Sequence, residues 1–384
     1  MRVAVLIHPF GRFGGAERLA ILHSAMLAEN GHDVVFYTDT SLMDRNWLSM
    51  LTDRVPIRQL PYGIQGRDLL RELDGFDRLL IHHHIEPFLA LQIVERYARK
   101  TYWYSGEVLR AIWEDQITGE DYRQFSPTVF VTAKHFYGRV SSILLCSILY
   151  NFTISMLRVV DKATVRRYAG IIANSQYMVD MIRKIYRYHG PMFVAYPASS
   201  LPSSMFQPNY GTGEYVLIVG AHMPNKNHRM LLEAVSLLEH PPELRVVGEG
   251  QETHRLKEQA RNLGVDAVFD SYVRREDLVR LYEKSLFVVV PSLSEPFGMT
   301  AVEAALAGKP SVVTALGGTK EFVVDHQTGF VVHPRKPREL ASAMEVLLED
   351  ENLRKTMGQR ARQRALDGFT LENSAMALSN ALNS

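Results

Sequence analysis

Two glutamates, Glu295 and Glu303, stand eight positions apart in the stretch of the sequence best suited to chemistry. An apolar run at 286–290 precedes them and predicts a buried strand, and ligands of open α/β sheets bind where strands end. Gly298 lies between the glutamates, where it lets a ligand approach the backbone and opens a predicted helix. The free N–H groups at that helix start would form an anion site. The two carboxylates could then hold a ribose and a transferred hexose on either side of a diphosphate.

This stretch has two interpretations. Two glutamates at this spacing, taken alone, are more typical of an ordinary helix start, which they cap and decorate. It is the complete string from 291 to 310 that favours a ligand site. The candidate ligand-contacting residues at the turn itself are Phe297, Gly298, Met299 and Thr300.

Apolar runs alternating with helical patterns must position this stretch. Such runs predict strands at 3–7, 34–37, 79–81, 101–104 and 171–173, and then at 215–219, 244–247, 267–269, 286–290 and 311–314. A segment rich in Pro, Ser and Gly at 201–213 is typical of a linker. The pattern predicts an α/β protein with two tandem Rossmann-like units and parallel sheets. We place these units at 1–200 and 206–368, with a last helix in 369–384 that packs back on the first.

The totals narrow the class of protein. The chain has 384 residues and a formal net charge of +1, so no overall field favours nucleic acid. Cys146 is the only cysteine, which excludes an internal disulfide and suits a reducing compartment. The N-terminal apolar run is too short for the hydrophobic core of a signal peptide. We therefore expect a cytoplasmic protein with no nucleic-acid partner.

Several motifs extend the pattern around Glu303. They include 303–310, the glycine-containing segments 14–18, 220–227, 317–321 and 328–330, and the triplet at 173–175. Together they resemble the signature of the retaining glycosyltransferases of family 4, which have the GT-B fold. The second half of the chain matches along nearly its whole length, and the first half matches in patches. The resemblance implies two Rossmann-like domains with parallel sheets that face an interdomain cleft.

The resemblance also implies roles for individual residues. Glu295 would bind hydroxyls of the donor sugar, and Glu303 would bind the ribose of the nucleotide. Lys226 would pair with the diphosphate as a point charge, so Glu295 and Lys226 would carry the catalysis.

The remaining donor contacts come from backbone positions. By the same resemblance, Gly14 and Gly15 would let the N-terminal unit approach the phosphate from its other side. The backbone near Tyr272 and Val273 would frame the base. No cofactor is implied, because the nucleotide-diphosphate sugar is itself a substrate.

One departure from the family concerns charge. The family usually has an arginine directly after the glycine at 220, and this chain has Ala221. Lys226 must therefore neutralise the diphosphate alone, or together with His222 or Arg12.

A second departure concerns the acceptor side. The best register places Gly106 where relatives carry a histidine, which leaves Glu107 and Arg110 as the nearest polar substitutes. His84, in the triplet 82–84 at the end of another predicted strand, is a further candidate. Three adjacent histidines suggest a metal site, but successive strand side chains point to opposite faces and cannot all bind one ion. Solvated or core roles for these histidines are favoured over catalysis.

The expected mechanism needs no metal. The sequence contains no Asp-x-Asp motif, which metal-dependent glycosyltransferases commonly use. The helix dipole and Lys226 would neutralise the diphosphate instead. A same-face displacement is favoured, because no carboxylate nucleophile can be assigned. The acceptor would be a glycan or a lipid-linked glycan.

A segment at 140–157 without any charged residue borders on the length of a membrane span. Within 134–167 the only acid is Asp161, against six basic residues. An apolar helix with basic flanks suits an anionic membrane surface, and a buried helix of the first unit is an equal alternative. Docking would place the protein on the inner face of the cytoplasmic membrane.

Three rival functions stay open. One is another enzyme of the same fold, such as a nucleotide-sugar epimerase or a phosphorylase. Another is a sugar-nucleotide-binding protein without turnover, which Ala221 and Gly106 would favour. The last is a nicotinamide-dependent dehydrogenase, although the glycines at 11–15 do not have the Gly-x-Gly-x-x-Gly spacing.

Overall fold

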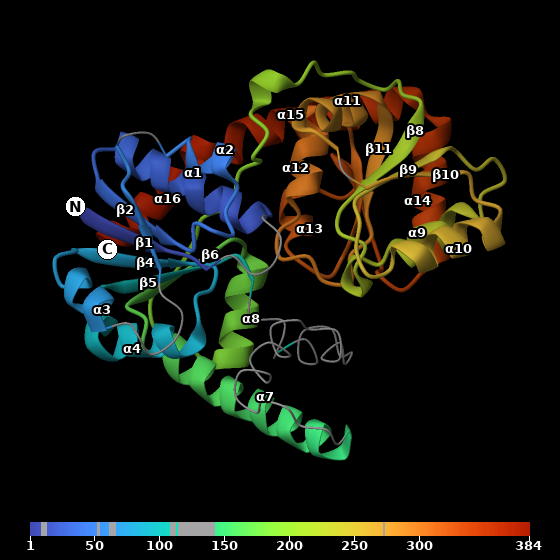
Figure 1. The fold of residues 1–384 in the computed structure, drawn as a ribbon. Helices are drawn as coiled ribbons and strands as arrows, with labels where there is room; N and C mark the ends of the chain where they lie inside the picture. The colour runs from blue at the N-terminus through green and yellow to red at the C-terminus, as the bar shows by residue number, and fades with distance from the viewer. Residues whose placement is uncertain (9–13, 52–53, 61–66, 108–112, 114–142, 272) are drawn as a thin grey trace. The chain divides into compact units, whose positions relative to one another are not determined.

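The computed structural model describes residues 1–8, 14–51, 54–60, 67–107, 113, 143–271 and 273–384. The chain divides into two compact units. The N-terminal unit contains Met1–Tyr196 and Ser374–Ser384, and the C-terminal unit contains Pro197–Asn373. Each unit is a parallel sheet with helices on both faces (Figure 1). The α/β fold class predicted from the alternating pattern is confirmed.

The N-terminal unit contains a seven-stranded sheet of order β3-β2-β1-β4-β5-β6-β7. The strand order reverses between β1 and β4, and this is the point where doubly wound sheets bind ligands. Central strands are buried on both faces, which explains their continuous apolar runs. The strands are β1 (Arg2–Leu6), β2 (Asp33–Thr38), β3 (Ile57–Gln59), β4 (Arg78–His82), β5 (Thr101–Ser105), β6 (Gly170–Ala173) and β7 (Met192–Val194).

Local capping explains where helices of this unit begin. The Glu86 carboxylate accepts from the backbone N–H groups of Phe88 and Leu89 at the start of α4, and Ser175 caps α8 in the same way. The helices are α1 (Gly15–Glu29), α2 (Arg45–Leu48), α3 (Arg67–Leu73), α4 (Pro87–Tyr97), η2 (Ala98–Lys100), α7 (Ile143–Val165), α8 (Gln176–Tyr186) and the C-terminal α16 (Leu371–Asn383).

The C-terminal helix α16 packs on the N-terminal unit through polar contacts. Ser374 Oγ lies 2.9 Å from His23 Nε2, and His23 Nδ1 lies 3.1 Å from His82 Nε2. Arg78 Nε donates to the carbonyl of Leu382 at 2.8 Å. Residues from opposite ends of the sequence therefore hydrogen-bond to one another within this unit.

The C-terminal unit contains a six-stranded sheet of order β10-β9-β8-β11-β12-β13. Its strands are β8 (Tyr215–Val219), β9 (Leu244–Val247), β10 (Ala267–Asp270), β11 (Ser285–Val290), β12 (Ser311–Thr314) and β13 (Gly329–Val332). Its helices are η4 (Ser203–Met205), η5 (Pro224–Lys226), α9 (His228–Val235), α10 (Thr253–Leu263), α11 (Arg275–Lys284), α12 (Met299–Leu306), α13 (Thr319–Phe322), α14 (Pro337–Glu349) and α15 (Glu351–Gly368).

Three strands were not predicted from the sequence, β3, β7 and β13, and each lies at an edge of its sheet. β3 and β7 have three residues each, none of them fully buried, whereas β13 has four residues and is mostly buried. A short edge strand such as β3 or β7 needs no continuous apolar run, so its sequence resembles that of a loop.

Candidate active site

The core of the candidate site is an ion pair between two loops that follow adjacent strands. Lys226 Nζ donates to Glu295 Oε2 at 2.6 Å, although the two are 69 positions apart in the sequence. Ser292 Oγ donates to the same carboxylate oxygen at 3.1 Å. Lys226 follows β8 and Glu295 follows β11, and these strands are neighbours. The structure thus brings both predicted catalytic residues together at the carboxyl edge of the sheet.

Asn227 joins these two loops. Its backbone is left-handed, with φ of 54°, which asparagine tolerates better than most residues. Its side-chain Nδ2 donates to the carbonyl of Pro291 at 3.0 Å and to that of Pro334 at 2.9 Å. The backbone of Leu293 also donates to the carbonyl of Asn225 at 2.9 Å. The Lys226 loop is therefore held at a defined distance from the Glu295 loop.

Glycines hold the backbone of Glu295 in place from the other side. Gly318 N donates to the Glu295 carbonyl at 2.8 Å. At Gly317, with φ of 135°, a Cβ atom would lie 2.3 Å from that same carbonyl oxygen. Only glycine fits this contact, which explains the glycine at 317.

Helix α12 begins beside Glu295 without a side-chain cap. Gly298 is its N-cap residue and has φ of 92°, a conformation that favours glycine. Met299 and Thr300, its first two residues, are half-buried. The uncapped helix start can bind an anion through its N–H groups and its dipole. This is the helix start at which the sequence predicts an anion site, and it lies next to the Lys226–Glu295 pair.

Glu303, one turn into α12, is held by two hydroxyls. Tyr282 Oη donates to its Oε2 at 2.7 Å, and Ser199 Oγ donates to its Oε1 at 3.3 Å. Burial and the adjacent Glu303 carboxylate raise the pKa of the Tyr282 phenol well above its usual value. Tyr282 therefore stays a neutral hydrogen-bond donor to Glu303. Neither hydroxyl was singled out from the sequence, because only the tertiary fold brings 199 and 282 to 303.

Phe297, Val273 and Tyr272 are further predicted donor-binding residues. Phe297 is buried and stacks on Phe369 at a centroid distance of 5.7 Å, so its side chain belongs to the core and only its backbone can face a ligand. Val273 is half-buried beside an open groove that includes Arg245 and Asp270. Tyr272 lies outside the described residues.

His222 is not available as a second diphosphate partner. Its ring is buried, its Nδ1 lies 2.8 Å from Thr253 Oγ1, and it packs edge-on against His228 and Phe269. Burial lowers its pKa, so it carries no charge to offset a diphosphate. The alternative that paired His222 with Lys226 is therefore wrong, and Arg12 lies outside the described residues.

The predicted glycine pair lies at the other ligand-binding edge, in the N-terminal unit. Gly14 N donates to Glu17 Oε2 at 2.9 Å, and helix α1 begins at Gly15. This helix start follows β1, next to the reversal of strand order. The carboxylate of Glu17 already occupies one N–H group there.

Two of the acceptor-side candidates follow neighbouring strands, His84 after β4 and Glu107 after β5. His84 lies 5.7 Å from Trp103, measured between ring centroids, and burial lowers its pKa to about 4. Glu107 is half-buried at the end of β5, and Arg110 lies outside the described residues. The glycine at 106 has a local cause, since a Cβ there would lie 2.1 Å from Cε1 of His83.

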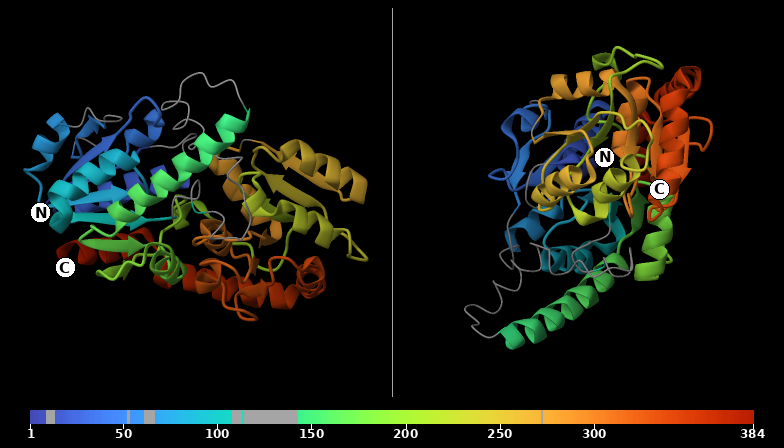
Figure 2. Two further views of the ribbon diagram at one scale, coloured as in Figure 1. Left: turned by 90° about the horizontal axis from the view of Figure 1, so that it is seen from below. Right: turned by 90° about the vertical axis from the view of Figure 1, so that its right-hand side faces the viewer.

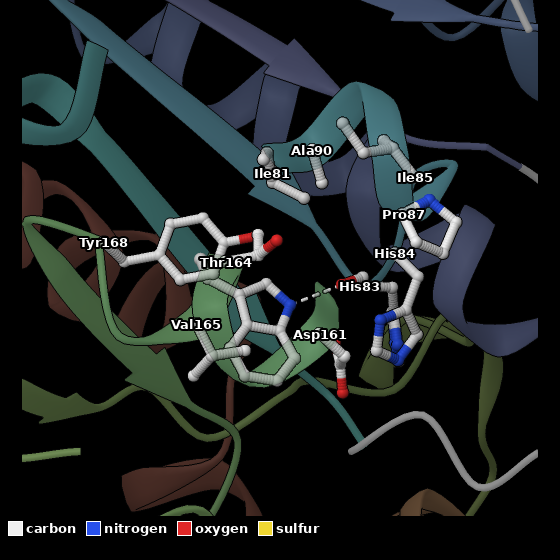
Figure 3. A pocket seen from close by; sticks show the side chains of 11 residues that line it. Ile81, His83, His84, Ile85, Pro87, Ala90, Asp161, Thr164, Val165 and Tyr168 are labelled. Carbon is white, nitrogen blue, oxygen red and sulfur yellow. Dashed lines mark hydrogen bonds between the residues drawn. The ribbon is translucent and has the colours of Figure 1, made fainter. Parts of the chain in front are cut away.

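A small cavity adjoins these residues (Figure 3). The side chains of His83 and His84 lie next to each other at this cavity, and Asp161 of α7 also lines it. Trp113 Nε1 and Tyr186 Oη each donate to Asp161 Oδ2 at 2.7 Å, while burial raises the Asp161 pKa to about 6. In the sequence Asp161 stands out only as the lone acid of a basic segment.

The described residues contain no group of three or more His, Cys, Asp or Glu side chains placed to hold a metal ion. No helix among them is long and apolar enough to cross a bilayer, and this includes α7.

Part of the chain matches a known protein family. Residues 204–364 match the family described as Glycosyl transferases group 1. The D-inositol 3-phosphate glycosyltransferase of Corynebacterium aurimucosum is 36% identical over 157 residues, 38% of this chain and 37% of that protein. Mannosylfructose-phosphate synthase of Agrobacterium fabrum is 32% identical over 197 residues, 48% of this chain and 43% of that protein. The chain thus matches less than half the length of these curated relatives.

Solved structures extend the likeness to the whole chain. Anabaena HepE in complex with UDP-glucose superposes with a TM-score of 0.75 at 18% identity, over 100% of this chain and 99% of that one. At that identity the likeness concerns the fold alone. Residues 204–364 therefore belong to the glycosyl transferases group 1 family, and the chain as a whole has the GT-B fold of solved glycosyltransferases.

Proposed function

We propose that this chain is a retaining, metal-independent glycosyltransferase. It moves a hexose from a nucleotide-diphosphate sugar to a hydroxyl of a glycan or glycolipid acceptor, in the synthesis of a surface polysaccharide or glycolipid. The observation that carries this proposal is the 2.6 Å contact between Lys226 and Glu295 beside the uncapped start of α12.

This arrangement has the charges that a nucleotide sugar requires. An anion at the start of α12 would meet the helix dipole and compete with Glu295 for the Lys226 ammonium. Side chains of both residues are partly accessible, at 30% for Lys226 and 14% for Glu295. Once Lys226 turns to the diphosphate, the Glu295 carboxylate can accept hydrogen bonds from sugar hydroxyls in its place. Glu303, held by Tyr282, would accept from the ribose.

The proposed reaction is a displacement on one face of the sugar. The bond from the anomeric carbon to the diphosphate oxygen breaks, and a bond to the acceptor oxygen forms on the same face. The leaving phosphate oxygen accepts the proton of the acceptor hydroxyl, so charge and protons balance. The protein positions the reactants and stabilises the charge that develops on the diphosphate. The transition state is oxocarbenium-like, and no residue of the chain forms a covalent intermediate.

A second candidate is a protein that binds nucleotide sugars without turnover. The observation in its favour is that Ala221 replaces a cation and that the neighbouring His222 is buried in the core. Lys226 is then the cation that the described site offers to the diphosphate. This candidate predicts ligand binding with no release of sugar.

The first experiment is a thermal-stability screen against uridine, guanosine and adenosine diphosphates and their sugars, with and without a chelator. A ligand at 100 times its dissociation constant adds about 2.7 kcal/mol, which shifts the melting temperature by a few degrees. One nucleotide that stands out in both conditions supports the metal-free site. Loss of that shift on chelation would contradict metal independence, and binding without sugar release would favour the second candidate.

We further propose that helix α7 docks on an anionic membrane surface. It packs against α4, and its N-terminal half extends beyond that helix (Figures 1 and 2). Phe152 and Val159, two turns apart on one face, are 62% and 68% exposed. Arg166 and Arg167 are exposed just beyond its end. Apolar side chains flanked by basic ones fit the boundary between anionic headgroups and acyl chains.

Vesicle co-sedimentation tests this docking. We expect binding to phosphatidylglycerol vesicles, weaker binding to phosphatidylcholine vesicles, and loss of binding in the double variant Phe152→Ser/Val159→Ser. Leu237→Ser is the matched control, because Leu237 is 51% exposed in the C-terminal unit. Equal binding by the double variant and the control would show that α7 does not dock.

A further inference from the structure

His83 has an unusual backbone at a position where doubly wound sheets bind ligands. It follows β4, which adjoins the reversal of strand order between β1 and β4. Its φ of 60° is left-handed, a conformation that costs energy for residues other than glycine. Two hydrogen bonds hold it there, from His83 N to the Tyr104 carbonyl at 2.9 Å and from Trp103 Nε1 to the His83 carbonyl.

The left-handed backbone places the imidazole over Gly106, which directly follows the neighbouring strand β5. A Cβ atom at 106 would lie 2.1 Å from His83 Cε1 and 2.3 Å from His83 Nε2. The ring therefore occupies the volume in which a side chain at 106 would begin. Gly106 and the strained backbone at 83 form one arrangement that presents an imidazole at the carboxyl edge of the sheet.

The chemistry of this imidazole suits a hydroxyl group. His83 is half-buried, and its ring nitrogens make no hydrogen bond to any residue that the structure describes. Burial and the nearby His84 and His23 lower its pKa to about 3, so the ring is neutral. A neutral imidazole offers one N–H donor and one acceptor nitrogen, and a sugar or polyol hydroxyl can hydrogen-bond with either of them.

The two neighbouring histidines have different contacts from those of His83. His82 stacks on Tyr104 at 4.5 Å and contacts His23, so it belongs to the buried network under α16. His84 lies beside Trp103 and the small cavity. His83 is the member of the triplet whose ring is held over a glycine at the strand ends.

We propose that His83 contacts the acceptor, and that its imidazole hydrogen-bonds a hydroxyl of a sugar or polyol acceptor in the N-terminal unit. This inference rests on the proposed transferase function. It assigns the acceptor-side role to His83 in place of His84.

Variants at 83 and 106 distinguish the loss of the imidazole contact from a change in backbone strain at 83. His83→Gly keeps the left-handed backbone at no steric cost but removes the ring. His83→Asn also tolerates that backbone and keeps an amide that can donate and accept. Gly106→Ala pushes the ring away in the native background, whereas the His83→Gly background removes the three ring atoms that lie nearest to the added Cβ. His189→Ala changes an exposed histidine of the same unit and serves as the control.

The measurement uses the nucleotide sugar selected in the thermal screen and the p-nitrophenyl glycoside that the native enzyme glycosylates fastest. KM for this acceptor should rise roughly threefold to tenfold in His83→Gly and in Gly106→Ala, because each variant loses one hydrogen bond to the acceptor. His83→Asn should reverse part of this increase in KM, and Gly106→Ala should cause no further increase in KM in the His83→Gly background. Nucleotide affinity and donor hydrolysis without acceptor should stay unchanged.

The possible outcomes are distinct. Native acceptor KM in His83→Gly, or a full additional effect of Gly106→Ala in that background, overturns the acceptor role. A KM increase matched by His189→Ala also overturns it, since the effect would then not depend on the position of the ring. A native protein that neither hydrolyses nor transfers the sugar contradicts the proposed function, and the acceptor role with it.

Discussion

Glu295 accepts hydrogen bonds from both Lys226 and Ser292. These contacts depend on the negative charge of its carboxylate as well as on the size of the side chain. Glu295→Gln keeps the size of the side chain and removes the charge. We expect sugar transfer to fall by at least a hundredfold, because interactions with the donor sugar in the transition state are lost. Initial rates of transfer, together with thermal unfolding to show an intact fold, measure this.

The control for that variant is Glu276→Gln, which changes an exposed glutamate at the start of α11. It should leave transfer unchanged. Full activity in Glu295→Gln would refute the assignment of the catalytic residue.

Tyr282 and Glu303 form the second residue-scale case. Tyr282→Phe removes the hydroxyl that orients Glu303 and leaves the buried ring in place. We expect the dissociation constant for the nucleotide to rise roughly threefold to tenfold, with little change in turnover of bound donor. Isothermal titration calorimetry with the selected nucleotide gives the value.

Tyr188→Phe is the matched control, because its buried hydroxyl donates to the Tyr168 carbonyl in the other unit. An unchanged nucleotide affinity in Tyr282→Phe, relative to this control, would count against a ribose role for Glu303.

The loop before α13 shows how an element positions a residue that belongs to another segment. Gly317→Ala would place a Cβ 2.3 Å from the Glu295 carbonyl oxygen and would add backbone strain at positive φ. We expect loss of transfer and a fall in stability that exceeds the roughly 1 kcal/mol typical of such strain alone. Chemical unfolding and transfer rates together check both effects.

Gly264→Ala isolates the strain from the clash. Gly264 also has positive φ, at 67°, but a Cβ there meets nothing within 4 Å. This variant should lose about 1 kcal/mol and keep its activity. Equal behaviour of the two variants would mean that the contact with Glu295 is unimportant.

At the scale of the whole molecule, buried histidines tie the two ends of the chain together. His23 lies between His82 and Ser374 of α16, and burial lowers its pKa from 6.5 to about 3. Below pH 6.5, His23 therefore binds a proton in the unfolded chain but stays neutral in the folded state. Stability from this group is fully present above pH 6.5 and is lost as pH falls toward 3, by about 2 kcal/mol at pH 5.

Urea unfolding of the native protein and of His23→Gln at pH 7.5 and pH 5 tests this effect. The variant is less stable at both values, but its loss between them should be smaller by about 2 kcal/mol. His189→Ala, at an exposed site, should keep the native loss. An identical pH dependence in His23→Gln would show that His23 does not stay neutral in the folded state.

The sequence by itself determined the fold class, because strands buried on both faces need continuous apolar runs and parallel strands need helices between them. It also singled out Glu295, Gly298 and Glu303, since a strand, a glycine turn and a helix follow one another within a few residues. Interactions that are local in sequence leave a local signal.

Only the tertiary structure decided which distant residues meet. It brought Lys226 to Glu295 through the pairing of β8 with β11, and Tyr282 to Glu303 through the packing of α11 near α12. It buried His222, which the sequence left open as a phosphate partner, and placed the His83 ring over Gly106. The physical reason is that neighbours across a parallel sheet are separated by whole helices in the chain, so no spacing in the sequence records their contact.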